Sequence, residues 1–327
     1  MKQKSFASSG FELVTKRTRK RKFLAEMNSL VPWAALVSLI EPHAPSGKTG
    51  WPPFAVLTLL RIRFMQQWFG LSDPAMEEAL HDVPLYCEFA QLDAGITRLP
   101  DEGTILRFRH LLEAHNLSAQ LLATINATLT AKGLMLKTGT VEDATLIAAP
   151  SSTKNDKGER DTEMHQIKKG NQWYFGMKAH IGVYAESGLV HTVMTTPANA
   201  HDVMQAYALL HGQEEVVFAD SGYRGVEKRQ EIGDKHAEVD WQIAMTPGKR
   251  KALDKTKASH ALKDKLENVK AGVRAKVEHP FRVIKCQFGF TKVRYKGLAK
   301  NTAQLLTLFA LSNLWMARNR ITQGALG

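Results

Sequence analysis

The spacing of apolar residues changes near residue 133. Between residues 23 and 133 they recur every three or four positions, with frequent glycine and proline between them. That spacing predicts short helices joined by tight turns. After Gly133 the spacing becomes typical of strands. The pattern therefore predicts an all-α N-terminal part, residues 23–133, followed by an α/β part, residues 134–327.

Runs of β-branched and aromatic residues in the second part predict strands. Residues 173–183 and 189–194 flank a glycine-containing turn, which is typical of a β-hairpin. Further strands are predicted over residues 139–147, 215–220 and 240–245, and helices over 199–210, 274–285 and 302–321. Residues 150–170 are predicted to form a loop, and the basic stretch from Pro247 onward a mobile segment.

The predicted helix over residues 274–285 carries two neighbouring stripes. Its apolar stripe comprises Val277, Phe281, Ile284 and Phe288. Beside it, Arg274, Glu278 and Lys285 are four and seven residues apart, so one acid and two bases would project from a shared face. A solvated row of ion pairs is the simpler interpretation. Pro280 lacks an N–H and is expected in a first turn or at a kink.

The net charge is +12, which favours a polyanionic partner, most commonly nucleic acid. Residues 1–22 hold eight Lys or Arg and one acid, and residues 274–327 hold ten and one. We expect residues 1–22 to form a flexible basic arm that either contacts the DNA backbone or serves as a solubilising tail. Its candidate DNA contacts are Lys16, Arg17, Arg19, Lys20, Arg21 and Lys22.

The two cysteines, Cys87 and Cys286, form no CxxC motif, so neither a disulfide framework nor a structural zinc site is expected. No apolar run has the length and composition of a membrane span or a signal peptide. We therefore expect a soluble, cytoplasmic protein.

Arg107 and Arg109 lie on a predicted helix that opens at Asp101. Short helices joined by tight turns are compatible with a helix-turn-helix DNA reader, in which these arginines would contact bases. Any small helical bundle shows the same pattern, so both interpretations remain open here.

Three acids far apart in sequence are candidates for chemistry. Asp143 lies inside a predicted strand, Asp220 ends another, and Glu278 lies on the late basic helix. Carboxylates brought together would suit Mg²⁺ or Mn²⁺, and two such ions support in-line phosphoryl transfer. A chain of this length offers many acid triples, so spacing alone does not single out this one. Glu142, beside Asp143, is expected to be a solvated neighbour on the opposite face.

The sequence resembles bacterial insertion-sequence DDE transposases, and among them the insertion-sequence-5-like subgroup with a Tyr-x2-Arg-x3-Glu-x6-Lys signature. Arg274, Glu278 and Lys285 match the last three positions of that signature, whereas Ala271 stands where the subgroup has tyrosine. The segments that resemble the family elsewhere are residues 141–145, 170–180, 199–202 and 218–223.

The resemblance implies a ribonuclease-H-like fold, a mixed sheet with helices on both faces, preceded by the helical domain. It also implies cleavage at terminal inverted repeats, followed by attack of the freed 3′-hydroxyls on target DNA. Asp143 and Asp220 would bind both Mg²⁺ or Mn²⁺ ions and Glu278 one. Arg274 and Lys285 would contact DNA phosphates, with Lys178, Tyr223 and Arg224 as further candidates.

Partners implied by the resemblance are double-stranded DNA and a second copy, as a homodimer on DNA at the bacterial nucleoid. A non-catalytic, degenerate or repurposed repeat-binding protein is the alternative from another functional class. A second alternative is a different enzyme of the same fold, such as a junction resolvase or a ribonuclease H. The helical domain and the basic arm favour DNA over RNA as the substrate, and the Arg, Glu and Lys spacing favours transposition.

Overall fold

The computed structural model describes residues 17–45, 47, 52–93, 95–135, 139–154, 158–235 and 238–324. The chain divides into two compact units. The first, which we call the helical unit, contains the residues up to Ile125 and those from Ala317 onward. The second, the sheet unit, runs from Asn126 to Met316.

The helical unit is built around α4 (Val56–Phe69), which buries side chains all around its circumference. The other elements of this region are α2 (Arg19–Leu30), α3 (Trp33–Ile40), the 3₁₀ turn η1 (Glu41–His43), α5 (Asp73–Asp82), α6 (Pro84–Ala90), α7 (Glu102–Ala114) and α8 (Leu117–Ala131). Ser72 caps α5 and Asp101 caps α7, each through a side-chain oxygen that accepts a backbone N–H. The predicted start of α7 at Asp101 is thus confirmed.

Part of the predicted flexible arm is helical. Arg19 to Lys22 form the first turn of α2, capped by Thr18, whose hydroxyl accepts the N–H of Arg21. The Lys20 ammonium donates to the Tyr86 hydroxyl at 2.9 Å. These contacts hold the start of α2 within the helical unit, and Lys16 lies outside the described residues.

No single helix among the described residues is long and apolar enough to cross a membrane. One pair of helical segments, Arg19–Leu30 with Trp33–His43, has the length and composition together, but it is bent by 70°.

The sheet unit contains six strands in one mixed sheet, which confirms the predicted α/β class. The strands are β1 (Gly139–Ala148), β2 (His165–Lys169), β3 (Gln172–Tyr184), β4 (Val190–Pro197), β5 (Val216–Ala219) and β6 (Asp240–Ile243). Their order is β2-β3-β1-β5-β6, with β4 also paired to β3. β1 runs antiparallel to β3 and parallel to β5. It therefore joins an antiparallel half to a parallel half.

Most predicted strands are confirmed, including the hairpin of β3 and β4. Two predictions are wrong. β2 forms within the predicted loop 150–170, because it pairs antiparallel with the start of β3. The segment predicted to be mobile after Pro247 contains α11 (Pro247–Lys251) and α12 (Ala258–Arg274), whose Glu267 accepts the backbone N–H of Met245.

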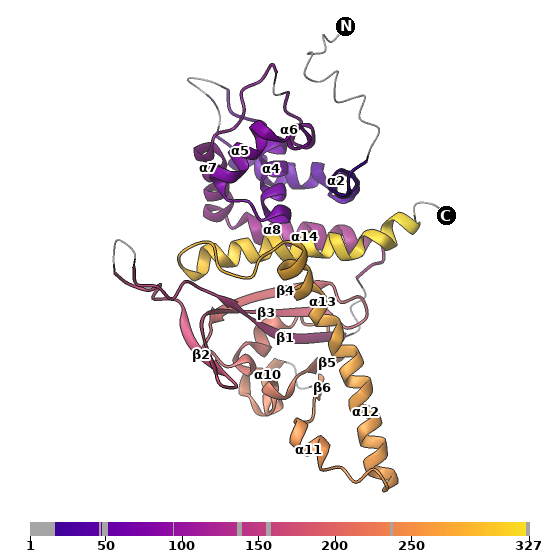
Figure 1. Cartoon of the computed structure of the whole chain (residues 1–327). Coiled ribbons are helices and arrows are strands. Elements are labelled where there is room, and N and C mark those ends of the chain that lie inside the picture. The colour runs from indigo at the N-terminus through magenta and orange to yellow at the C-terminus, as the bar shows by residue number, and fades with distance from the viewer. Residues whose placement is uncertain are drawn as a thin grey trace. The chain divides into compact units, whose positions relative to one another are not determined.

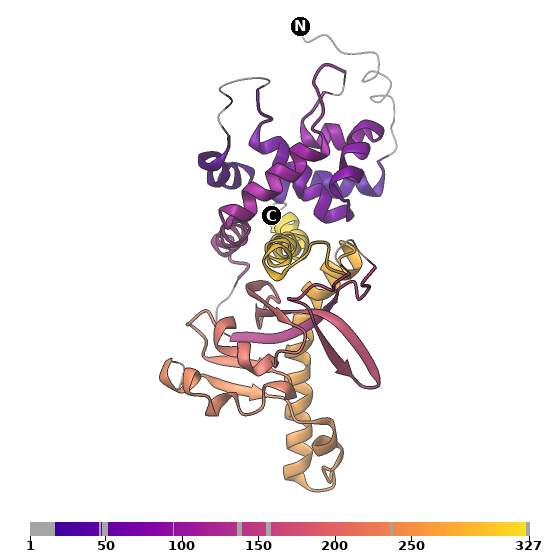
Figure 2. The ribbon, with the colours of Figure 1, turned by 90° about the vertical axis from the view of Figure 1, so that its left-hand side faces the viewer.

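Shorter helical elements connect the strands of the sheet unit. They are η2 (Asp202–Gln205), α9 (Ala206–Leu209), η3 (Ser221–Tyr223), η4 (Val226–Lys228) and α10 (Gln230–Lys235). The final helix, α14 (Leu298–Gly324), includes and extends the predicted helix 302–321. Figures 1 and 2 both show α12 running alongside the sheet.

The helix predicted over residues 274–285 is broken into four pieces. α12 ends at Arg274, and a 3₁₀ turn η5 (Ala275–Val277), a short α13 (Glu278–Arg282) and a π-helical turn η6 (Val283–Gln287) follow. Pro280 is the third residue of α13, where its missing N–H falls among the groups that lack a partner within the helix. The predicted apolar stripe is confirmed, since all four of its side chains are buried.

Gly176 sits where β1 and β3 approach closely, opposite Ala148. A Cβ at this position would overlap the carbonyl oxygen of Ile147, which is backbone and cannot move aside. We expect Gly176→Ala to lower the free energy of unfolding by about 1–3 kcal/mol, as overpacking does. Gly272→Ala, in open space on α12, is the control and should raise it by up to about 1 kcal/mol. Urea unfolding measures both, and equal effects would contradict the close approach.

His191 on β4 lies between the rings of Tyr184 and His211, with centroids 4.7 and 4.8 Å away. Loss of hydration and then the neighbouring His211 lower its pKa to about 3. An unfolded histidine titrates near pH ~6.5. Between these values the unfolded chain binds more protons, so this residue makes the fold less stable as pH falls from about 6.5 to 3.

Substituting His191 should therefore flatten the pH dependence of unfolding. As pH falls from 6.5 to 4, we expect the unfolding free energy of His191→Gln to decrease less than that of the parent. The two proteins should differ in this slope by up to ~1.4 kcal/mol per pH unit. Urea titrations at several pH values measure this. Parallel stability curves for the two proteins would show that His191 does not titrate in this way.

Candidate active site

Two aspartates occupy matching positions on neighbouring parallel strands. β1 pairs with β5 so that Glu142 lies opposite Ala219. Asp143 follows Glu142 on β1, and Asp220 follows Ala219 at the end of β5. Matching positions of two parallel strands remain side by side. The register therefore places these two carboxylate-bearing residues next to each other, where β5 ends.

The third predicted acid comes from the broken helix. Glu278 begins α13 and is exposed. Burial raises the pKa of Asp143 to about 7, against the opposing effect of a hydrogen bond from the Ala144 N–H. The charges of Asp220 and Glu278 raise this pKa further, and that of Arg274 lowers it. The charges of the other two acids and of one base of the predicted site thus each act on Asp143.

Each aspartate is oriented by a local backbone bond. An Asp143 oxygen accepts the Ala144 N–H at 2.7 Å, and Asp220 Oδ1 accepts the Gly222 N–H at 2.7 Å. A Cβ at Gly222 would lie 2.9 Å from Asp220 Oδ1, so the absence of a side chain there leaves room for the carboxylate. Among the described residues no other hydrogen bond is formed by these two carboxylates, which leaves their second oxygens available to a ligand.

Lys285 connects the broken helix to the strand of Asp143. Its ammonium donates to the Thr145 hydroxyl at 2.6 Å and to the Leu146 carbonyl at 3.2 Å. Partial burial lowers the pKa of Lys285, and Lys169 adds to this effect, while the charge of Glu278 opposes it. Lys285 therefore holds η6, which follows α13, against β1.

The carboxylates of Asp143, Asp220 and Glu278 are of the chemical type that binds a hard divalent cation, although the three side chains do not form a close group. Within the described part of the chain, no three His, Cys, Asp or Glu side chains form a group that could hold a metal ion. Carboxylate oxygens are the ligands that Mg²⁺ and Mn²⁺ prefer. Burial is the main cause of the raised pKa of Asp143, and the negative charges of Asp220 and Glu278 add to it. A bound cation would offset that repulsion.

Two family descriptions cover most of the chain. Residues 135–314 match the family described as Transposase DDE domain, and residues 12–111 match a second one, Transposase domain (DUF772). The first match covers more than half of the sequence and contains Asp143, Asp220 and Glu278. The chain belongs to the DDE transposase family. Together the two matches identify an insertion-sequence DDE transposase.

Three predicted DNA contacts of this transposase are buried and have other roles. Lys178 is 6% exposed, and its ammonium donates to the carboxylate of Asp202 at 2.9 Å. Arg109, also 6% exposed, pairs with Glu113 at 2.8 Å. Tyr223 is 1% exposed and belongs to the core cluster beneath β5 and β6. Each of these side chains pairs or packs within the protein in this structure, and their role as DNA contacts stays a prediction.

Other predicted DNA contacts lie on the surface of their units. Arg224 is exposed in the turn after Asp220, and Arg107 is exposed on α7, where it donates to the Thr104 hydroxyl at 3.0 Å. The described basic residues at the start of the transposase are all at least partly exposed. They are Arg17, Arg19, Lys20, Arg21 and Lys22.

Glu142 is not the solvated neighbour that strand alternation predicted. It does point away from the face of Asp143, but its side chain is fully buried. Neither of its carboxylate oxygens has a hydrogen-bond partner among the described residues. Burial, and then the charge of Glu214, raise the pKa of Glu142 well above its usual value. Alternation alone could not find this, because it does not show that the sheet face that carries Glu142 is covered.

Tyr223→Phe tests the core position of Tyr223. Its hydroxyl is buried without a partner in the described structure, so its removal should leave stability unchanged or raise it by up to ~1 kcal/mol. Affinity for DNA should not change. Thermal unfolding and fluorescence anisotropy with a labelled duplex measure the two quantities, and Arg224→Gln serves as an exposed comparison. Loss of DNA affinity in Tyr223→Phe alone would restore its role as a DNA contact.

Proposed function

We propose that this transposase cuts DNA at the terminal inverted repeats of its own insertion sequence and joins the freed ends to target DNA. The observation that supports this most directly is the pairing register of β1 and β5, which makes Asp143 and Asp220 neighbours. The charge of Glu278 reaches the same site. Two carboxylates on neighbouring strands and a third whose charge reaches them suit metal-assisted phosphoryl transfer.

In this proposal Asp143 and Asp220 bind two ions, Mg²⁺ or Mn²⁺, and Glu278 binds one of them. When bound, such ions supply activation of the attacking oxygen and stabilisation of the leaving oxygen. The Ala144 and Gly222 N–H groups keep the aspartates oriented, each by one hydrogen bond. One oxygen of each carboxylate is thereby fixed before any substrate arrives.

The reaction consists of two displacements at phosphorus. In the first, water attacks the phosphodiester at the element end, and the 3′-oxygen leaves and gains a proton. In the second, that 3′-hydroxyl loses its proton, attacks a phosphodiester of the target and displaces the target's own 3′-oxygen. The same carboxylates serve both steps, because the geometry at phosphorus is the same.

The bases near the site hold and position the DNA in this proposal. Arg274, at the end of α12, is partly exposed and close enough to act on Asp143, so it can neutralise a phosphate beside the scissile bond. Arg224 is a second candidate on the surface. Lys285 has a different role: it keeps the Glu278 segment attached to β1 through Thr145.

We further propose the insertion-sequence-5-like subgroup, a homodimer on DNA and a location at the nucleoid. The subgroup rests on the spacing of Arg274, Glu278 and Lys285, which is retained although Ala271 replaces the signature tyrosine. Cutting the two ends of an element in concert requires two active sites. This is the reason for expecting a dimer.

Removing one carboxylate at a time tests the proposal. We expect Asp143→Asn, Asp220→Asn and Glu278→Gln each to abolish cleavage, a loss of at least about 10³-fold, because each removes an anionic ligand. The substrate is a labelled duplex carrying the inverted repeat that flanks the reading frame, incubated with Mg²⁺ or Mn²⁺. Cleavage products are resolved on denaturing gels.

DNA affinity and thermal unfolding of the three variants are the controls. Both should remain close to those of the parent protein. Specific repeat binding with no cleavage by any protein, the parent included, would favour the non-catalytic alternative. Loss of folding in all three variants would show instead that these acids are structural.

A further inference from the structure

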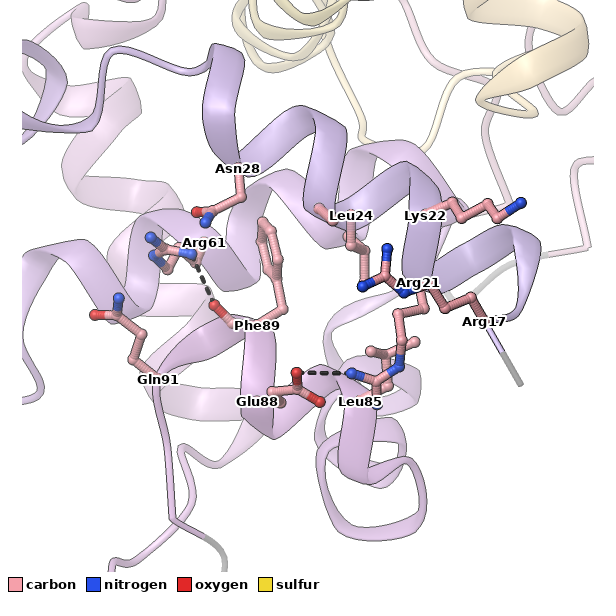
Figure 3. Close-up of a pocket in the computed structure, with 11 residues that line it drawn as sticks. Arg17, Arg21, Lys22, Leu24, Asn28, Arg61, Leu85, Glu88, Phe89 and Gln91 are labelled. Carbon is pink, nitrogen blue, oxygen red and sulfur yellow. Dashed lines mark hydrogen bonds and ion pairs between the residues drawn. The ribbon is translucent and has the colours of Figure 1, made fainter. Parts of the chain in front are cut away.

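A pocket of about 400 Å³ lies in the helical unit between α2, α4 and α6. Figure 3 shows Arg61 at one end of this pocket and Arg17, Arg21 and Lys22 at the other. Among the described residues that line the pocket, Glu88 is the one carboxylate, and it is paired with Arg21 at 2.8 Å. The pocket is therefore strongly cationic.

Arg61 is the innermost of these bases. It projects from α4, which is buried all around, and only 5% of its side chain is exposed. Its guanidinium packs against two rings, with its central carbon 4.3 Å from the Trp33 centroid and 5.1 Å from the Phe89 centroid. Contact with two rings, which are inclined to each other by 66°, restricts the position of the guanidinium.

The hydrogen bonding of Arg61 is incomplete. Its Nη1 donates to the Phe89 carbonyl at 3.0 Å, but its Nε is buried with no partner among the residues that the structure describes. No carboxylate in the described part of the chain forms an ion pair with it. Burial lowers the pKa of Arg61. A buried charge in this state is unfavourable unless an anion pairs with it.

We propose that this pocket binds a phosphodiester group of the DNA backbone, with Arg61 as its anchor and Arg17 and Lys22 at its mouth. A guanidinium matches the oxygens of a phosphate in a two-pronged geometry, and the contacts with Trp33 and Phe89 restrict its position before a phosphate binds. The proposal rests on the proposed function, in that DNA is the polyanion this protein handles. It adds Arg61, a residue of the helical core, to the proposed DNA contacts. Arg61 would contact the DNA backbone and not the bases.

The test compares two buried arginines of the same helix. Arg63 is also 5% exposed, but it does not line the pocket, and it donates to Gln66 within α4. We would measure anisotropy of a labelled terminal-repeat duplex and of an unrelated duplex, with salt varied from about 50 to 200 mM. The proteins are the full-length parent, Arg61→Gln, Arg61→Lys and Arg63→Gln.

We expect Arg61→Gln to bind both duplexes about tenfold more weakly, because a phosphate contact carries no sequence information. The slope of log affinity against log salt should fall by about one. Arg61→Lys should recover part of the loss, and Arg63→Gln should bind like the parent. Thermal unfolding of each protein separates loss of the contact from loss of the fold.

Other outcomes overturn the proposal in distinguishable ways. Equal affinities for the parent and Arg61→Gln would remove the pocket from DNA binding while leaving the proposed function intact. Equal weakening by Arg61→Gln and Arg63→Gln would assign both residues to folding only. Stabilisation of the parent by inorganic phosphate, without any DNA defect in Arg61→Gln, would assign the pocket to a free anion. A parent that binds neither duplex would contradict the proposed function as well.

Discussion

The parallel pairing of β1 with β5 is the constraint on which the candidate active site depends. It joins strands that are more than seventy residues apart in sequence and brings Asp143 and Asp220 to the same level of the sheet. Crowded carboxylates repel one another, and the partial burial of Asp143 strengthens that repulsion. The ladder hydrogen bonds of β1, which has a partner on each side, hold the acids together nonetheless. Hydrogen bonds between the strands thus hold the two carboxylates near each other despite their mutual repulsion.

The break between α12 and α13 determines how Glu278 and Lys285 are placed relative to β1. A regular helix from Arg274 to Lys285 would keep both residues and Glu278 in a fixed angular relation. The 3₁₀ turn before Glu278 and the π turn after Arg282 change that relation. Lys285 reaches Thr145 on β1, while Glu278 stays exposed and its charge acts on Asp143. Turns of this type are common at functional positions for this reason.

Sequence patterns predicted the features that depend on local order. The strand around Asp143, the hairpin of β3 and β4 and the apolar stripe between Val277 and Phe288 follow from residue spacing. The family resemblance supplied the predicted joint role of three distant acids. Burial of individual polar residues was not predictable in this way. Lys178 and Tyr223 lie in segments that resemble the family, yet their partners come from η2 and the core beneath β5. β2 was missed because only its pairing with β3 makes its polar sequence a strand.

Two buried ionisable residues show how the same physical problem is solved differently in the two units. Glu142 is fully buried without a hydrogen-bond partner in the described structure, and its raised pKa lets it become neutral by binding a proton. Arg61 cannot follow that route, because a guanidinium remains protonated in proteins. Its positive charge has to be compensated by neighbouring groups or by a ligand. The protein supplies two rings and one carbonyl but no described anion, and the pocket beside Arg61 opens toward further cations. A ligand that brings negative charge is therefore what this arrangement lacks, whereas Glu142 requires none.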